Sequence, residues 1–194
     1  MAWRWLAALG LLAGTGGCVF AELPDLHAAA REDDVDRIAT LVKAGAELNR
    51  LDDRLNRWTP LMHAVHRRAR RAALALIGAG ADVNARGGGG TTALIMAAGY
   101  GETDVVRALL EAGADPRAES QDGQTALWAA AGGMAIADIT DGPPIGGCFP
   151  DTVGVLLERA PEMRLKKNLE TRALGWFARS AECRALLAKL QAGS

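Results

Sequence analysis

The segment TTALIMAAGYGETDVVRALLEAGADPRAESQDG, Thr91–Gly123, decides the fold of this chain. It opens with Thr92-Ala93-Leu94 and an apolar run of helical character, which Gly99 interrupts. The run Val105–Leu110 then has apolar residues at helical spacing, and Gly113 follows where a glycine commonly ends a helix. The segment therefore predicts two short helices joined by a turn and followed by a polar loop.

The same unit recurs along the chain at a fixed period. Its opening triplet starts every 33 residues, at Thr59-Pro60-Leu61, Thr92-Ala93-Leu94 and Thr125-Ala126-Leu127. The first helical leucine and the terminal glycine are 19 positions apart in three units, at Leu26 and Gly45, Leu61 and Gly80, and Leu94 and Gly113. Constant spacing of this kind predicts a solenoid in which each helix pair packs on the next one.

A period of 33 residues with this order of elements resembles the ankyrin repeat. The family motif T-P-L-H-x-A corresponds to the segment Thr59–Ala64, and His27 keeps the motif histidine in the first unit. The family ending G-A-D-V-N-A is complete at Gly80–Ala85. The resemblance covers about residues 23–190 and implies an all-α solenoid of about five helix-turn-helix repeats connected by hairpin loops.

The expected ankyrin-repeat domain is 22–194, with repeats at about 23–51, 58–86, 91–119, 123–166 and 168–191. Leu127 and Ala160 are 33 positions apart instead of 19, so repeat 4 carries an insert of about 14 residues within Ala137–Pro150. Proline and glycine are too frequent there to extend a helix. Repeat 5 is degenerate and is expected to form the polar cap that a terminal repeat needs. Trp128 replaces the motif histidine in repeat 4, and its hydrogen bond should be lost.

The first 21 residues predict a secretory signal peptide. Arg4 precedes the apolar run Leu6–Gly14, which is too short to span a bilayer, and Val19-Phe20-Ala21 offers a cleavage site before Glu22. We therefore expect a periplasmic or secreted protein. Gly16-Gly17-Cys18 leaves open a lipid anchor on Cys18 as the less favoured alternative, because Thr15 stands where such sites prefer leucine.

Charge and cysteine usage agree with an exported repeat domain. A net charge of −1 with 49% hydrophobic residues indicates a folded domain without a membrane span and gives no reason to expect nucleic acid as a partner. Cys148 and Cys183 remain after removal of the signal peptide, and an oxidising compartment favours a disulfide between them. In a cytosolic protein both would be ordinary buried thiols.

Five residues are candidates for contact with a partner: Trp58, His66, Arg67, Tyr100 and Asp141. Trp58 stands on a projecting loop, where an aromatic side chain can anchor a partner or can pack against the neighbouring loop. Tyr100 is expected at the exposed end of an inner helix. Asp141 belongs to the insert, which would provide an accessory contact.

Arg67 belongs to a group of four arginines, together with Arg68, Arg70 and Arg71, on a chain of nearly neutral charge. These arginines could pair with acidic residues of repeat 1, at Asp33, Asp34 and Asp36, where exposed pairs contribute only about 0–1 kcal/mol each. They could instead meet an acidic partner and accelerate its association. Both interpretations remain open at this point.

Motifs for catalysis, metal or cofactor binding are not found in the sequence. His63 and His66 could share a helix face, but no third ligand follows at metal spacing. Gly87–Gly90 lacks the Lys-Ser/Thr that follows a phosphate-binding loop, and its glycines fall where a hairpin turns. We therefore expect no catalytic residue, metal or cofactor; an enzyme with its site in the insert at 138–150 is the least favoured alternative.

The resemblance implies a protein partner bound by the concave face and the loop tips of a chain that is monomeric when unbound. Exported bacterial ankyrin proteins include immunity proteins, which bind and neutralise a toxic enzyme. Others are thought to support periplasmic oxidative-stress enzymes such as catalase. The resemblance implies both options and does not choose between them; we take an immunity-type inhibitor as the leading expectation, with an accessory or scaffold protein as the alternative.

Overall fold

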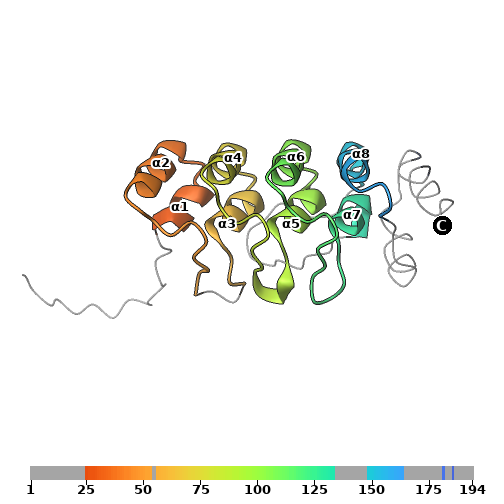
Figure 1. The fold of residues 1–194 in the computed structure, drawn as a ribbon, viewed down its shortest axis with the longest axis horizontal. Coiled ribbons are helices and arrows are strands. Elements are labelled where there is room, and N and C mark those ends of the chain that lie inside the picture. Colours follow the sequence, from red (N-terminus) through yellow and green to blue (C-terminus); the bar gives the residue numbers. More distant parts are fainter. Residues whose placement is uncertain (1–24, 54–55, 134–147, 164–180, 182–184, 186–194) are drawn as a thin grey trace, which may run out of the picture.

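The computed structural model describes residues 25–53, 56–133, 148–163, 181 and 185. Over these residues the chain forms four helix pairs that stack side by side (Figure 1). The pairs are α1 (Asp25–Arg31) with α2 (Val35–Lys43), α3 (Pro60–His66) with α4 (Arg70–Gly78), α5 (Ala93–Tyr100) with α6 (Thr103–Glu111), and α7 (Ala126–Trp128) with α8 (Pro150–Arg159). The predicted all-α solenoid is confirmed for these four repeats, whereas the signal peptide and most of repeat 5 lie outside the described residues.

The helices form two layers with the loops along one edge (Figure 1). The outer helices α2, α4, α6 and α8 make one row, and the inner helices α1, α3, α5 and α7 make the other. In α6 the buried residues are Val105, Val106, Leu109 and Leu110, at the spacing that turns one helical stripe towards the inner layer. All eight residues of α5 are buried, as expected for a helix that is apolar on every side.

Recurring residues of the sequence start and end the helices. The side chains of Thr59, Thr92 and Thr125 accept hydrogen bonds from backbone N–H groups in the first turns of α3, α5 and α7. Gly45 follows α2 at a φ of 85°, and the N–H of Ala46 donates to the carbonyl of Leu41 across it. This arrangement satisfies carbonyl groups that the helix end leaves free, which explains why a glycine returns at this point of repeats 1, 2 and 3.

The first three turns between inner and outer helices each contain a left-handed residue, and of these three only the third uses glycine. Asp33, Arg68 and Gly101 have φ values of 55°, 56° and 69°. The side chains of Asp33 and Arg68 both reach the next repeat, where they meet the N–H of Ala72 (2.7 Å) and the carbonyl of Tyr100 (3.3 Å). Contacts between repeats therefore help to hold two residues in a conformation that is strained for any side chain.

Repeat 4 departs from the regular pattern. The three-residue α7 continues into a widened turn, η2 (Ala129–Gly133), in which Gly132 has a φ of 104°. The N–H of Phe149 donates to the carbonyl of Ala130 (2.9 Å), just before α8 begins. Among the described residues, the buried Trp128 Nε1 has no hydrogen-bond partner, as expected where tryptophan replaces the motif histidine. The insert at 134–147 lies outside the described residues.

The connecting loops reverse direction through isolated backbone bonds. Gly87 N–H donates to the carbonyl of Thr91 (2.9 Å) across η1 (Gly88–Gly90), and Ser120 N–H donates to the carbonyl of Gln124 (2.9 Å). No regular strand forms in the part of the chain that the structure describes, because each loop contributes too few paired residues. The expected hairpin loops are thus present as tight turns without a strand ladder.

Candidate protein-interaction surface

Trp58 lies in the core rather than at a loop tip. Its side chain is 6% exposed, and its ring centroid lies 4.7 Å from that of His66 and 5.4 Å from that of His63. Of the two interpretations for Trp58, the geometry is that of packing, because a binding anchor would have to leave these neighbours before it could touch a partner.

Tyr100 and His66 are also buried, and they contact each other. Their exposed fractions are 3% and 6%, and the Tyr100 hydroxyl lies 2.6 Å from His66 Nδ1. The expectation that Tyr100 is exposed was wrong, because Arg68 of the preceding repeat covers it. The guanidinium of Arg68 lies 5.5 Å from the centre of the Tyr100 ring and also donates to its carbonyl.

The five residues that the sequence suggested for partner contact therefore lie in different places. Trp58, His66 and Tyr100 come together inside the solenoid across repeats 2 and 3. Arg67 is exposed at the end of α3, and Asp141 lies outside the described residues. Every residue of α3 and of α5 is buried, so these two inner helices present no exposed side chain to a partner.

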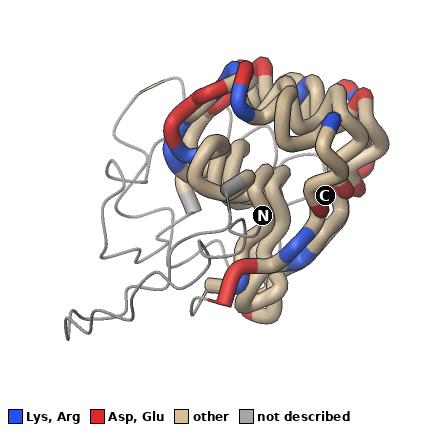
Figure 2. The backbone as a smooth tube through the Cα atoms, turned by 90° about the vertical axis from the view of Figure 1, so that its left-hand side faces the viewer, with Lys and Arg blue, Asp and Glu red and all other residues tan. Residues whose placement is uncertain are grey.

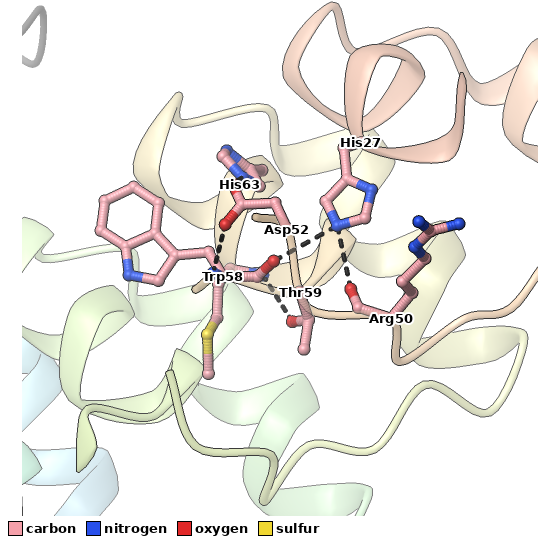
Figure 3. Close-up of polar contacts among 7 residues, drawn as sticks. His27, Arg50, Asp52, Trp58, Thr59 and His63 are labelled. Carbon is pink, nitrogen blue, oxygen red and sulfur yellow. Dashed lines mark hydrogen bonds and ion pairs between the residues drawn. The ribbon is translucent and has the colours of Figure 1, made fainter. Parts of the chain in front are cut away.

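A buried polar network fastens the loop between α2 and α3 to the inner helices (Figure 3). His63 Nε2 donates to Asp52 Oδ2 (2.6 Å), and Asp52 Oδ1 accepts from the N–H of Trp58 (3.0 Å). His27 Nε2 donates to the carbonyls of Arg50 (2.9 Å) and Trp58 (3.2 Å), which fixes the hydrogen on that nitrogen. The loop is therefore held from both α1 and α3.

The histidines of this network are neutral at neutral pH. Burial lowers the pKa of His63 to about 4 from its ordinary value of 6.5, although the hydrogen bond to Asp52 opposes the shift. Burial likewise lowers the pKa of His27, against the raising effect of its bond to the Arg50 carbonyl. Among the described residues no three potential ligands gather to hold a metal ion. The geometry assigns this network to positioning the loop.

The loops that follow the outer helices form a second, exposed set of contacts that runs from repeat to repeat. Asn49 Oδ1 accepts from the N–H of Asp82 (2.8 Å), and Asn84 Oδ1 accepts from the N–H of Asp115 (2.8 Å). In the next repeat Arg117 occupies the asparagine's place and forms an ion pair with Glu162. The sequence interpretation missed this series, although the recurring asparagine of the segments Gly45–Asn49 and Gly80–Asn84 is a visible signal for it.

Further bonds connect the tips themselves. Arg86 donates to the carbonyls of Gly90 (3.1 Å) and Glu119 (2.7 Å). Gln121 N–H donates to the carbonyl of Gly89 (2.8 Å), which links the loop of repeat 3 to that of repeat 2. Exposed polar side chains occupy this edge, at Asn56, Arg57, Asp82, Arg86, Glu119 and Gln121. These side chains therefore project from loops whose backbones are already fixed to one another.

On the opposite ends of the helices, the arginines of repeat 2 pair with repeat 3 and not with repeat 1. Arg70 lies 2.5 Å from Asp104, and Arg68 lies 3.7 Å from Glu102. Asp34 instead caps α2 by accepting from the N–H of Arg37 (3.0 Å). Viewed from the first repeat, the acidic run at the α1–α2 turn forms a red segment between blue ones (Figure 2). Among the described residues, these arginines therefore do not form the ion pairs with the acids of repeat 1 that one of the two interpretations expected.

An open pocket of about 350 Å³ lies between the outer helices α6 and α8. Its walls carry two arginines and two glutamates around an apolar floor; the lining residues are Arg107, Leu110, Glu111, Val155, Glu158 and Arg159. Opposite charges alternate at its rim, so it does not select one sign of ligand charge.

Two overlapping matches to the family model described as "Ankyrin repeats (3 copies)" cover residues 26–120 and 69–139. The chain belongs to the ankyrin-repeat family. A "Putative ankyrin repeat-containing protein" from Treponema pallidum (strain Nichols) is 39% identical over 85 residues. That alignment covers 43% of this chain and 28% of the relative, so the chain matches less than a third of the longer protein.

Ankyrin repeats are typically protein-interaction modules rather than enzymes. In the four stacked repeats of this ankyrin chain the exposed described residues lie on the loops, on the turns between the helices and on the outer helices, whereas α3 and α5 have none. Within the described ranges no helix is long and apolar enough to cross a bilayer.

Proposed function

We propose that this ankyrin protein is an exported, non-enzymatic module that binds a partner enzyme and neutralises it. The observation that carries the proposal is the connected series of loops, in which Asn49, Asn84 and Arg86 fix each loop to the next one. Loops held in this way lose little conformational freedom on binding, and this lowers the free-energy cost of forming a complex.

The loop tips are the proposed contact surface. The inner helices α3 and α5 have no exposed residue, whereas charged side chains such as Arg57, Arg86 and Glu119 are exposed at the loop edge. A row of charges of both signs on a rigid backbone supports recognition of one complementary protein rather than general attraction.

A surface of this shape suits the inhibition of an enzyme. A series of stacked loops can cover the opening of an active site without entering the reaction itself, and the protein then needs no catalytic group of its own. The family resemblance implies an immunity role and an accessory role alike, and both rest on the signal peptide predicted at 1–21.

Export is tested on the mature protein. Mass spectrometry of protein from the periplasm is expected to show Glu22 as the N-terminus. A lipid-modified Cys18 terminus would establish an anchored form instead, and an intact Met1 terminus would contradict export.

Binding is tested by capture from periplasm followed by identification of the partner and an activity assay. We expect an enzyme whose turnover falls when the purified ankyrin protein is added in equal amount. Arg57→Gly is the informative variant, because Arg57 has a φ of 47° that glycine adopts without strain, so the turn is kept while the side chain is removed. Lys43→Ala on α2 is the control, and equal inhibition by both variants would contradict a loop-tip surface. A captured enzyme whose turnover is maintained or increased would favour the accessory role.

A further inference from the structure

The turn edge of repeat 2 carries an unusual concentration of positive charge. We call Arg67, Arg68, Arg70 and Arg71 the basic edge; all four are exposed. They span the end of α3 and the beginning of α4, at the opposite ends of the helices from the loop tips.

Arg71 is placed where the other outer helices carry an acid. It is the second residue of α4, and the second residues of α2, α6 and α8 are Asp36, Asp104 and Asp151. The helix dipole favours negative charge in the first turn and disfavours positive charge there. Repeat 2 therefore reverses the charge at a position where folding favours an acid.

Two arginines of the basic edge have structural partners. Arg70 pairs with Asp104, and Arg68 contacts Glu102 and the Tyr100 ring. The side chains of Arg67 and Arg71 form no hydrogen bond or ion pair with the residues that the structure describes, although the backbone N–H of Arg67 donates to the carbonyl of His63. The first turn of α4 is stabilised instead by Asp33, which accepts the N–H of Ala72. The charges of Arg67 and Arg71 therefore do not contribute to the packing of the described repeats.

We propose that the basic edge is a docking surface for an acidic segment of the partner protein, with carboxylates bound by Arg67 and Arg71. This proposal rests on the proposed function, in which the partner is a protein. A guanidinium forms paired hydrogen bonds with a carboxylate, and such bonds are stronger than those between neutral groups.

A short acidic segment fits this surface better than an extended polyanion does. Acids of the adjacent repeats flank the arginines, at Asp36 and Glu32 on one side and Asp104 on the other. A nucleic acid carries closely spaced charges along its whole length and would meet these carboxylates as it crossed the neighbouring repeats. A few carboxylates in a row can contact Arg67 and Arg71 alone.

The probe for this surface is a fluorescently labelled peptide of consecutive glutamates, added to the full mature chain and followed by anisotropy. Binding is expected at low salt and should weaken about tenfold at physiological ionic strength, because exposed charges are screened there. The double variant Arg67→Gln/Arg71→Gln should bind about tenfold more weakly than the natural protein. The matched control Arg107→Gln/Arg159→Gln removes the same charge from α6 and α8 and should bind normally.

Two further measurements test whether Arg71 has only a structural role and whether the peptide binds at the loop tips instead. Arg71→Gln should keep or slightly raise the melting temperature, because it removes a cation from a helix start; a clear fall would assign Arg71 to folding and overturn the proposal. Arg57→Gly should bind the glutamate peptide normally even where it abolishes inhibition of the partner. Equal losses in the two double variants, absence of peptide binding, or tighter binding of an oligonucleotide or an anionic vesicle would each refute the docking surface.

Discussion

His63 Nε2 lies 2.6 Å from Asp52 Oδ2, and the two side chains are 5% and 1% exposed. This pair connects an inner helix to the loop that precedes it, in a part of the protein from which water is excluded. Because the pKa of His63 is lowered to about 4 by burial, the contact exists at neutral pH as a neutral imidazole that donates to the carboxylate.

The first prediction is that the protein loses stability in weak acid. The pKa of His63 is about 4 when folded and about 6.5 when unfolded, so the unfolded chain binds more protons between these values. The free energy of unfolding is therefore highest, as far as His63 is concerned, above pH 6.5, and it falls by about 3 kcal/mol as the pH drops to 4. Denaturant unfolding measured across this range tests it. The lowered pKa of His27 acts in the same direction.

The variant His63→Gln provides the control for this effect. Glutamine can donate to Asp52 but does not titrate, so the slope of stability against pH between 6.5 and 4 should become shallower. An unchanged slope would show that other groups produce the acid sensitivity.

The second prediction is that Trp58→Ala acts on stability. Removing a buried aromatic side chain typically costs about 3–5 kcal/mol, and Trp58 packs against both His63 and His66. Leu74→Ala is the comparison, because Leu74 is 37% exposed on α4 and its loss should cost less than about 1 kcal/mol. Urea unfolding measures both losses, and equal losses of unfolding free energy for the two variants would contradict the burial of Trp58.

The third prediction compares two glycines that have the same sign of φ. Gly113 has a φ of 91° and open space where a methyl group would lie, so Gly113→Ala should cost only backbone strain, about 1 kcal/mol. Gly101 has a φ of 69°, and a methyl group there would overlap the ring of Phe149. Gly101→Ala should therefore lower the free energy of unfolding clearly more than Gly113→Ala, and a smaller loss would contradict the close approach of Phe149.

The fourth prediction is the disulfide between Cys148 and Cys183. Cys183 lies outside the described residues, so the argument remains the stacking of equivalent turns in repeats 4 and 5. The bond would close a loop of 35 positions and stabilise the fold by about 3–4 kcal/mol. Thiol titration of the oxidised, denatured mature protein should find no free thiol, and two free thiols per chain would exclude the bond.

The repeat period and the helix ends could be predicted because they depend on local backbone chemistry. A threonine that caps a helix and a glycine with positive φ act within a few residues, as at Thr92 and Gly113. The exposure of Tyr100 could not be predicted in the same way, because it is set by His66 and Arg68 of the preceding repeat.

The ion pairs of the arginines could not be predicted from the sequence either. Acids stand in both neighbouring repeats, and the sequence does not tell which of them Arg70 meets. The contact of Arg70 with Asp104 depends on the three-dimensional arrangement of α4 and α6. The asparagines of the loop tips were predictable, since Asn49 and Asn84 recur in the same short motif.

The asparagine bonds of the loops repeat from one junction to the next, but near the turns between the helices each junction has a different side-chain contact. A carboxylate caps a helix at the first junction (Asp33 to Ala72), a histidine meets a phenol at the second (His66 to Tyr100), and two hydroxyls meet at the third (Thr103 to Thr152). Exchanging two internal repeats would separate every one of these pairs while leaving each helix intact. The units are therefore alike in backbone, but the contacts of His66 with Tyr100 and of Thr103 with Thr152 favour one order of the repeats.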